Sequence, residues 1–225
     1  MPLHGTAFIA MWHGIQSGQE DQYLDWHTRE HMPERLGVPG FLQGRRFVDW
    51  SIKPHQTFTL YESAHIETFR SPGYMARLNA PTEWSNRVQP SMRDFLRAAC
   101  EIVFSLGDGV GGAIAPIRLK STSHPHGGFE SELMAKTVGF SRREGVCALH
   151  LGKHVPEIAM APTAESRLRP PQAGADFDYL LLIEGVAPDA MQTVRVAIEK
   201  DLTALGIICE GGAEYPLSYA LQAPR

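Results

Sequence analysis

The sequence has 225 residues, 43% of them hydrophobic and 20% charged, a composition typical of a globular protein with one large domain or two small ones. The net charge of -4 does not favour a nucleic acid or an anionic membrane as a partner. No apolar run reaches the roughly 18 residues that span a bilayer, and three widely spaced cysteines argue against a disulfide framework. We therefore expect a cytoplasmic protein without a signal peptide.

The first half of the chain predicts the element order β-α-β-β-α-β. The expected strands cover residues 6–13, 41–50, 56–62 and 98–106. A helix is expected from about 18 to 36, since Ser17 and Glu20 have the spacing of a capping box. Pro33 removes one backbone donor inside this helix and predicts a kink. Further helical segments, interrupted by prolines, precede the last strand.

The second half predicts the same element order again, after a glycine-rich stretch at 107–112. The expected strands cover residues 113–120, 145–153, 177–184 and 215–222. Helices are expected at 129–138 and 188–205, the latter from apolar residues at spacings of three and four. The proline-rich, polar segment 162–175 predicts an exposed or mobile loop. We therefore predict two tandem repeats, at 1–108 and 109–225.

Each repeat would form an antiparallel sheet with helices on one face. The other face of each sheet also needs cover, because its apolar residues cannot remain in water. Two sheets facing each other within one chain satisfy this need. The prediction is an α+β protein with a barrel-like core and helices outside.

The densest cluster of polar and aromatic residues lies in the first predicted helix. His27 and His31 are four residues apart and therefore share one helix face, with Trp26 beside them. Glu30 and Glu34 form a second such pair. A helix over the mouth of a pocket could use all of these side chains, whereas a helix facing only water would gain nothing from them.

The sequence of this helix and of the segments that follow it resembles that of a known protein family. The matching runs are WHxxEHMPERL (26–36), VPGF (38–41), RRF (45–47), TLYE (59–62) and SPxY (71–74). They resemble the EthD-like branch of the dimeric α/β-barrel superfamily over roughly residues 6–106. The resemblance implies two ferredoxin-like βαββαβ repeats forming a fused dimeric α/β-barrel. Members of the superfamily include lyases, isomerases, dehydratases, monooxygenases and haem-binding enzymes, so the fold does not select the reaction.

His31 is the first candidate for a catalytic residue. It occupies the position of the family's motif histidine, and an imidazole can exchange a proton near neutral pH. Glu34, one turn further along, or Glu30 would orient it or raise its basicity. We expect the ring to face a hollow between the two sheets. The alternative is a buried histidine that hydrogen-bonds a backbone carbonyl and fixes the helix to the sheet.

Arg46 and Tyr61 complete the predicted catalytic group. Arg45 and Arg46 point to opposite faces of a strand, so one of them could meet a substrate carboxylate or enolate. Tyr61 could donate a hydrogen bond to a developing oxyanion. The alternatives are an ion pair for the arginine and ordinary core packing for the tyrosine.

Five further side chains are predicted to line an aromatic, substrate-binding cavity. They are His13, His27, Trp12, Trp26 and Phe47. For each of them, core packing or a loop edge is the alternative. His150 and His154 are expected at the surface.

The run 27–31 also matches H-x-x-E-H, in which His27 and His31 could bind zinc. Pro33 bends the helix that such a site needs straight, so we expect no metal and no organic cofactor, with haem or zinc as alternatives. The expected function is a cofactor-independent lyase or isomerase of catabolism that acts on a small aromatic or alicyclic metabolite. The alternatives are a non-catalytic ligand-binding or stress-related protein and a haem- or metal-dependent oxygenase. An exposed edge could still pair two copies in a homodimer.

Overall fold

The computed structural model describes residues 3–121, 129–159, 162–170 and 174–224. The chain divides into two compact units. The N-terminal unit comprises His4–Ala99, Val155–Ala175 and Ser218–Arg225, and the C-terminal unit comprises Met1–Leu3, Cys100–His154 and Asp176–Leu217. These units do not coincide with the stretches 1–108 and 109–225, because two segments from the second half pack in the N-terminal unit. The predicted bounds of the two repeats, 1–108 and 109–225, stay a prediction from element order.

The sheet of the N-terminal unit has the strand order β4-β1-β3-β2-β9. Its strands are β1 (Ala7–Ile15), β2 (Phe41–Val48), β3 (Thr57–Ser63), the first part of β4 (Met92–Gly107) and the last part of β9 (Tyr215–Gln222). β3 pairs antiparallel with both β1 and β2. This order places β1, which carries His13, and β3, which carries Thr57, Thr59 and Tyr61 at alternate positions, inside the sheet rather than at its edges.

The strand register decides which side chains can meet the helices. Met11 lies opposite Thr59, and Ile9 lies opposite Tyr61, so these four residues share one face of the sheet. Their neighbours along each strand point to the other face. Trp12, Phe47 and Phe58 lie there, with ring centroids 5.0 Å apart for Trp12–Phe58 and 5.9 Å apart for Phe47–Phe58. Trp12 and Phe47 are therefore core residues of the opposite face.

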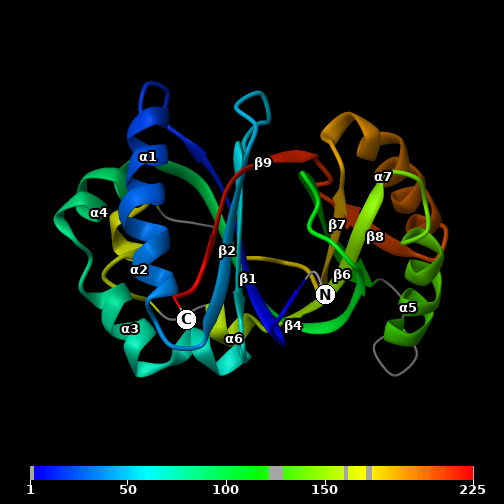
Figure 1. Cartoon of the computed structure of the whole chain (residues 1–225), viewed down its shortest axis with the longest axis horizontal. Helices are drawn as coiled ribbons and strands as arrows, with labels where there is room; N and C mark the ends of the chain where they lie inside the picture. The colour runs from blue at the N-terminus through cyan, green and yellow to red at the C-terminus, as the bar shows by residue number, and fades with distance from the viewer. Residues whose placement is uncertain (1–2, 122–128, 160–161, 171–173, 225) are drawn as a thin grey trace. The chain divides into compact units, whose positions relative to one another are not determined.

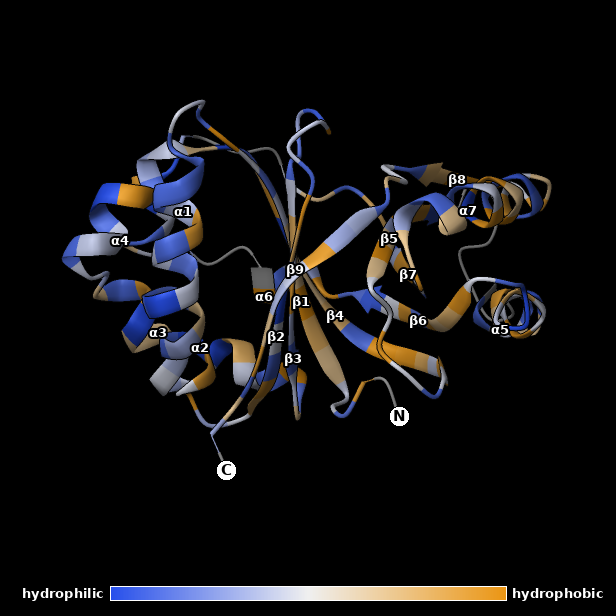
Figure 2. Cartoon of the chain, turned by 45° about the horizontal axis from the view of Figure 1, so that its top comes forward, coloured by the Kyte–Doolittle hydropathy of each residue, from blue (hydrophilic) through white to orange (hydrophobic). Residues whose placement is uncertain are grey.

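A layer of helices covers the first of these faces (Figure 1). It contains α1 (Glu20–Trp26), a π-helical turn (His27–His31), α2 (Met32–Leu36), α3 (Pro72–Asn79) and α4 (Glu83–Val88). Shorter helical segments lie at Ile66–Arg70, Gln89–Ser91, Pro156–Ala159 (α6) and Ser166–Leu168. In Figure 2 this layer is coloured mostly as hydrophilic, as expected for helices with one solvent-facing side.

The irregularity predicted at Pro33 is confirmed, and it takes the form of the π-helical turn just before it. Pro33 has no amide hydrogen to donate to the carbonyl of Arg29, so the usual α-helical bond cannot form there. The backbone widens over one turn instead. The helix begins at Glu20, and Ser17 gives it no side-chain cap, so the predicted capping box is wrong.

Gly44 lets the helix layer approach the sheet closely. A Cβ atom at this position would lie 2.9 Å from Cε1 of Tyr61 and 3.0 Å from Sδ of Met32. We expect Gly44→Ala to lower the free energy of unfolding by about 1–3 kcal/mol, because both neighbours are buried and must move. Gly73→Ala is the matched control, since its nearest side-chain atom is 3.7 Å away and alanine favours a helix. Urea unfolding of both variants measures the difference, and equal effects would contradict the argument.

The C-terminal unit contains the second part of β4, β5 (Ala113–Ser121), β6 (Val146–His154), β7 (Tyr179–Gly185) and β8 (Ile207–Glu210). Its helices are α5 (Phe129–Phe140) and α7 (Pro188–Thr203), which lie beside these strands in Figure 1. The predicted apolar face of α7 is confirmed, since Met191, Ile198 and Leu202 are buried in one core cluster with Leu149 and Leu181. β8 was not predicted.

Among the described residues, no helix is both long and apolar enough to span a bilayer.

Candidate functional site

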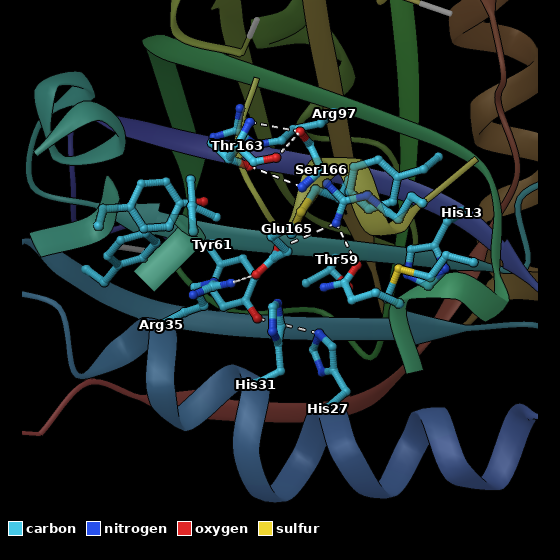
Figure 3. Close-up of a pocket in the computed structure, with 18 residues that line it drawn as sticks. His13, His27, His31, Arg35, Thr59, Tyr61, Arg97, Thr163, Glu165 and Ser166 are labelled. Carbon is cyan, nitrogen blue, oxygen red and sulfur yellow. Dashed lines mark hydrogen bonds and ion pairs between the residues drawn. The ribbon is translucent and has the colours of Figure 1, made fainter. Parts of the chain in front are cut away.

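A cavity of about 100 Å³ lies between the sheet and the helix layer of the N-terminal unit. All 18 residues that line it belong to this unit. They come from β1, β2, β3 and β4, from the helix that carries His27 and His31, from α3 and the turn at Gln89, and from the segment around Glu165 (Figure 3). The expectation that His31 faces a hollow between two sheets is therefore wrong, because the cavity lies between one sheet and its own helices.

His31 points into this cavity from the π-helical turn (Figure 3). Its ring packs against Trp26, with centroids 4.3 Å apart, and only 7% of the residue is exposed. The Nδ1 atom is buried without a hydrogen-bond partner among the described residues. Burial, followed by the positive charges of Arg35 and Arg169, holds the pKa of His31 well below its ordinary value. The ring is therefore neutral near pH 7, and the alternative of Nδ1 bonded to a carbonyl is not observed.

His27 and Tyr61 form a second polar pair in the same lining. The Nε2 atom of His27 lies 3.5 Å from Oη of Tyr61, and Arg46 Nη1 lies 3.4 Å from Nδ1. Since a guanidinium only donates, Nδ1 is the acceptor and Nε2 carries the hydrogen towards Tyr61. Burial raises the pKa of Tyr61 well above its ordinary value, so it stays a phenol whose hydrogen can be donated to a ligand.

Arg46 does not line the cavity. Besides contacting His27, its Nη1 atom donates to the backbone oxygen of Leu24 at 3.2 Å and to Oγ1 of Thr28 at 3.0 Å. The predicted role of Arg46 in meeting a developing negative charge therefore has no support from its position. Its contacts hold α1 and the ring of His27 instead.

Neither glutamate of the helix orients His31. Glu34 does not line the cavity, and its carboxylate lies 3.4 Å from Nη1 of Arg35. Partial burial raises the pKa of Glu34. Glu30 accepts a hydrogen bond from Oγ1 of Thr82 at 2.5 Å, on the side of α4. The predicted pairing of His31 with Glu34 is therefore wrong.

Sequence reasoning missed a buried group of charges in the lining. Glu165 forms ion pairs with Nη2 of Arg35 and, at 3.5 Å, with Nη1 of Arg169. Arg169 also donates to Oε1 of Gln89 at 2.6 Å, and its guanidinium lies 4.0 Å from the ring centroid of Phe95. Burial lowers the pKa of Arg169. Burial also acts to lower the pKa of Arg35, but the carboxylate of Glu165 and the other nearby anionic groups together outweigh it, and the pKa is raised.

This group lies partly in the segment 162–175, which was expected to be an exposed loop. That expectation is wrong for Thr163 and Glu165, which are 4% and 5% exposed, whereas Pro162, Arg167 and Pro170 are exposed as expected. The two arginines account for the burial, because they neutralise a carboxylate that water would otherwise hold at the surface. The spacing of Glu165 and Arg169, four residues apart, was the one local signal that could have revealed it.

The cavity carries a net positive charge. Three arginines, Arg35, Arg97 and Arg169, stand against the single carboxylate of Glu165, and the three histidines are neutral. Three positive charges less one negative charge leave a net charge of +2. The lining therefore favours an anionic ligand.

The remaining predicted residues are placed as follows. His13 lines the cavity, is 3% exposed and has its Nδ1 atom 3.2 Å from the carbonyl oxygen of Gly14. Trp26 lies behind His31 and donates from Nε1 to Oγ of Ser85 at 3.3 Å, outside the lining. Of the predicted cavity residues, His13 and His27 therefore line it, and Trp12, Trp26 and Phe47 do not.

The described side chains do not form a zinc site. His27 and His31 both line the cavity, but the described residues contain no group of three or more His, Cys, Asp or Glu placed to hold a metal ion. A structural or catalytic zinc site needs at least three protein ligands. The expectation that the chain uses no organic cofactor and no haem stays a prediction.

The three histidines predict how stability depends on pH. Burial lowers the pKa of His13 to about 3, and those of His27 and His31 also lie well below 6.5. Below about pH 6.5 the unfolded histidines bind protons and the folded ones do not, so protonation favours the unfolded chain. Each histidine should remove roughly 1 kcal/mol of stability per pH unit. Urea unfolding between pH 7 and 5 measures this slope, which His31→Leu should reduce by about one third; an unchanged slope would contradict the assignment.

Comparison with known proteins shows the fold. No family model and no curated protein matches the sequence. An anthrone oxidase-like protein matches with a TM-score of 0.62 and 10% identity, over 100% of this chain and 97% of that one. A protein provisionally named chlorite dismutase matches with a TM-score of 0.60 and 9% identity, over 96% of each chain.

A heme-binding protein from Thermus thermophilus matches with a TM-score of 0.54 and 10% identity, over 96% of this chain and 92% of that one. The predicted fold class is confirmed: the chain is an α+β protein of two tandem ferredoxin-like repeats, of the fused dimeric α/β-barrel type. At 9–10% identity these likenesses show the fold alone. The resemblance to the EthD-like branch stays a prediction.

Proposed function

We propose that the cavity binds a small anionic or enolisable aromatic or alicyclic metabolite and that His31 exchanges a proton with it. The observation that carries this proposal is the buried, unpartnered Nδ1 atom of His31 in the cavity lining. A buried polar atom without a hydrogen bond costs about 1–3 kcal/mol, so its retention suggests a partner that arrives with the ligand.

The charges of the lining support proton abstraction. The pKa of His31 is low partly because Arg35 and Arg169 are positive. An anionic ligand beside these arginines would offset their charge and raise the basicity of the imidazole towards neutral pH. The same arginines would stabilise an enolate or phenolate as it forms.

The proposed step moves one proton. His31 removes a proton from a carbon or oxygen next to a carbonyl or aromatic ring, and the electron pair moves onto the ligand oxygen. The phenol of Tyr61, held 3.5 Å from His27, can donate a hydrogen bond to that oxygen. Return of the proton at another carbon gives isomerisation, and loss of a leaving group gives elimination. Both are reactions of the isomerase or lyase class.

The name of the anthrone oxidase-like neighbour favours a second candidate. A ligand deprotonated by His31 would be electron-rich and could be oxidised by dioxygen as the co-substrate. Both candidates begin with proton transfer to His31. The second candidate differs from the isomerase or lyase because it consumes dioxygen.

The test is hydrogen exchange in D2O. A panel of small aromatic and alicyclic keto acids and phenols would be incubated with the purified chain, and deuterium incorporation followed by NMR with an oxygen electrode in parallel. The proposal expects exchange in at least one compound. Exchange with oxygen consumption selects the second candidate, and saturable binding without exchange would overturn both in favour of a ligand-binding protein.

A further inference from the structure

The C-terminal unit contains a polar cluster that takes no part in the cavity. Ser105 on β4 lies opposite His150 on β6 in the strand register, and Glu184 lies on the neighbouring strand β7. The side chains of His150 and Glu184 are both 0% exposed, whereas Ser105 is half-buried. The expectation that His150 lies at the surface is wrong. His154 is also buried, with Nδ1 3.1 Å from the carbonyl oxygen of Phe177.

The hydrogen bonds of this cluster form a continuous chain. Oγ of Ser105 lies 2.8 Å from Nδ1 of His150, and Nε2 of His150 lies 3.1 Å from Oε1 of Glu184. The other carboxylate oxygen of Glu184 accepts a hydrogen bond from the backbone amide of Gly111 at 2.9 Å. Both carboxylate oxygens are thus occupied, so the orientation of Glu184 is fixed.

This arrangement selects one tautomer of His150. A carboxylate only accepts, so Nε2 carries the hydrogen that points at Glu184. In the neutral ring Nδ1 is then the acceptor, and it faces the hydroxyl of Ser105. The hydroxyl is therefore positioned to lose its proton to His150, while Glu184 stabilises the imidazolium that forms. A nucleophile, a base and a group that orients the base are the parts of an activated serine.

We propose that Ser105 is a nucleophile that accepts acyl groups from small activated esters. Oγ of Ser105 attacks the carbonyl carbon, and its proton passes to Nδ1 of His150. The bond between the carbonyl carbon and the alcohol oxygen breaks, and His150 returns the proton to the leaving alcohol. Water then attacks the acyl-serine, gives a proton to His150, and releases a carboxylic acid while Ser105 regains its proton. The net reaction is hydrolysis of an ester to an acid and an alcohol.

The burial pattern supports a reactive rather than a purely structural cluster. Placing a histidine and a glutamate in a sheet interior costs solvation free energy that leucines would not cost. The buried pair leads to the hydroxyl of Ser105, a residue that is only half-buried, and an electrophile from solution could meet it there. A hydrogen-bonded series of serine, histidine and glutamate therefore indicates a reactive serine, which a chemical label can test.

The experiment is acylation of the full chain with p-nitrophenyl acetate, followed by peptide mass spectrometry. We expect one acetyl group on Ser105, which Ser105→Ala removes. His150→Gln, checked for folding by circular dichroism, should slow acylation at least 100-fold. Ser141→Ala is the matched control, since Ser141 donates to the carbonyl oxygen of Val138 and has no histidine partner here.

The deciding measurement is the acetylation of the wild-type protein. Acetylation of Ser105 that depends on His150 supports the proposal. Absence of an acyl group on Ser105 together with p-nitrophenolate release that Ser105→Ala does not lower, or equal labelling of Ser105 and Ser141, would overturn it.

Discussion

Replacing His31 with leucine should slow proton transfer by about 100-fold to 10,000-fold while raising the free energy of unfolding by about 1 kcal/mol. The Nδ1 atom of His31 is buried without a partner, so an apolar side chain of similar size removes a desolvation cost. Leucine can keep the packing against Trp26, which lies 4.3 Å from the imidazole centroid. Loss of activity with a gain in stability is a combination that a merely structural histidine would not give.

The rate is measured as deuterium exchange in the compound that the D2O panel identifies, and stability by urea unfolding. His27→Leu is the matched control, because it lies one turn earlier in the same lining. Its ring contacts Arg46 and Tyr61, so this variant should lose stability. If His31→Leu were destabilised as much as His27→Leu and still exchanged deuterium, His31 would have a structural role only.

Two kinds of local pattern predicted much of the fold. The element order of the first half and the apolar spacing of α7 depend on residues close in the chain, and both are confirmed. The second half follows its predicted order except for the additional strand β8. The motif helix likewise placed His27 and His31 on one face, and the structure brings both to the same cavity. The repeat of apolar residues along a helix or strand, and the spacing of nearby residues, can be read directly from a sequence.

Two other features depend on residues far apart in the sequence. They are which face of a strand lines the cavity and which residue pairs with a buried charged side chain. Trp12 and His13 are adjacent, yet only His13 reaches the cavity, because neighbouring residues of a strand point to opposite faces. Arg35 and Glu165 are 130 positions apart in sequence, and no local pattern joins them. The proline-rich composition around Glu165 correctly predicted a loop. It did not predict that Glu165 is buried, because composition does not show that a distant arginine pairs with this carboxylate.

Glu165→Ala should lower the free energy of unfolding by about 3–5 kcal/mol, because it leaves Arg35 and Arg169 buried without their shared carboxylate. Glu67→Ala is the matched control. Glu67 pairs with Arg70 at the surface, with side chains 59% and 61% exposed, and such pairs contribute at most about 1 kcal/mol. Urea unfolding of the two variants at one ionic strength measures the contrast.

The same variant tests whether the cavity selects anions. Removing the carboxylate of Glu165 opens a space between two arginines, and a small carboxylate such as acetate or benzoate should occupy it. At 100 times its dissociation constant such a ligand restores about 2.7 kcal/mol. Benzoate should therefore stabilise Glu165→Ala more than the wild-type chain, and more than chloride does at equal ionic strength. If benzoate stabilised neither chain more than chloride does, Arg35 and Arg169 would serve only to hold the segment around Glu165, and the case for an anionic ligand would lose its electrostatic basis.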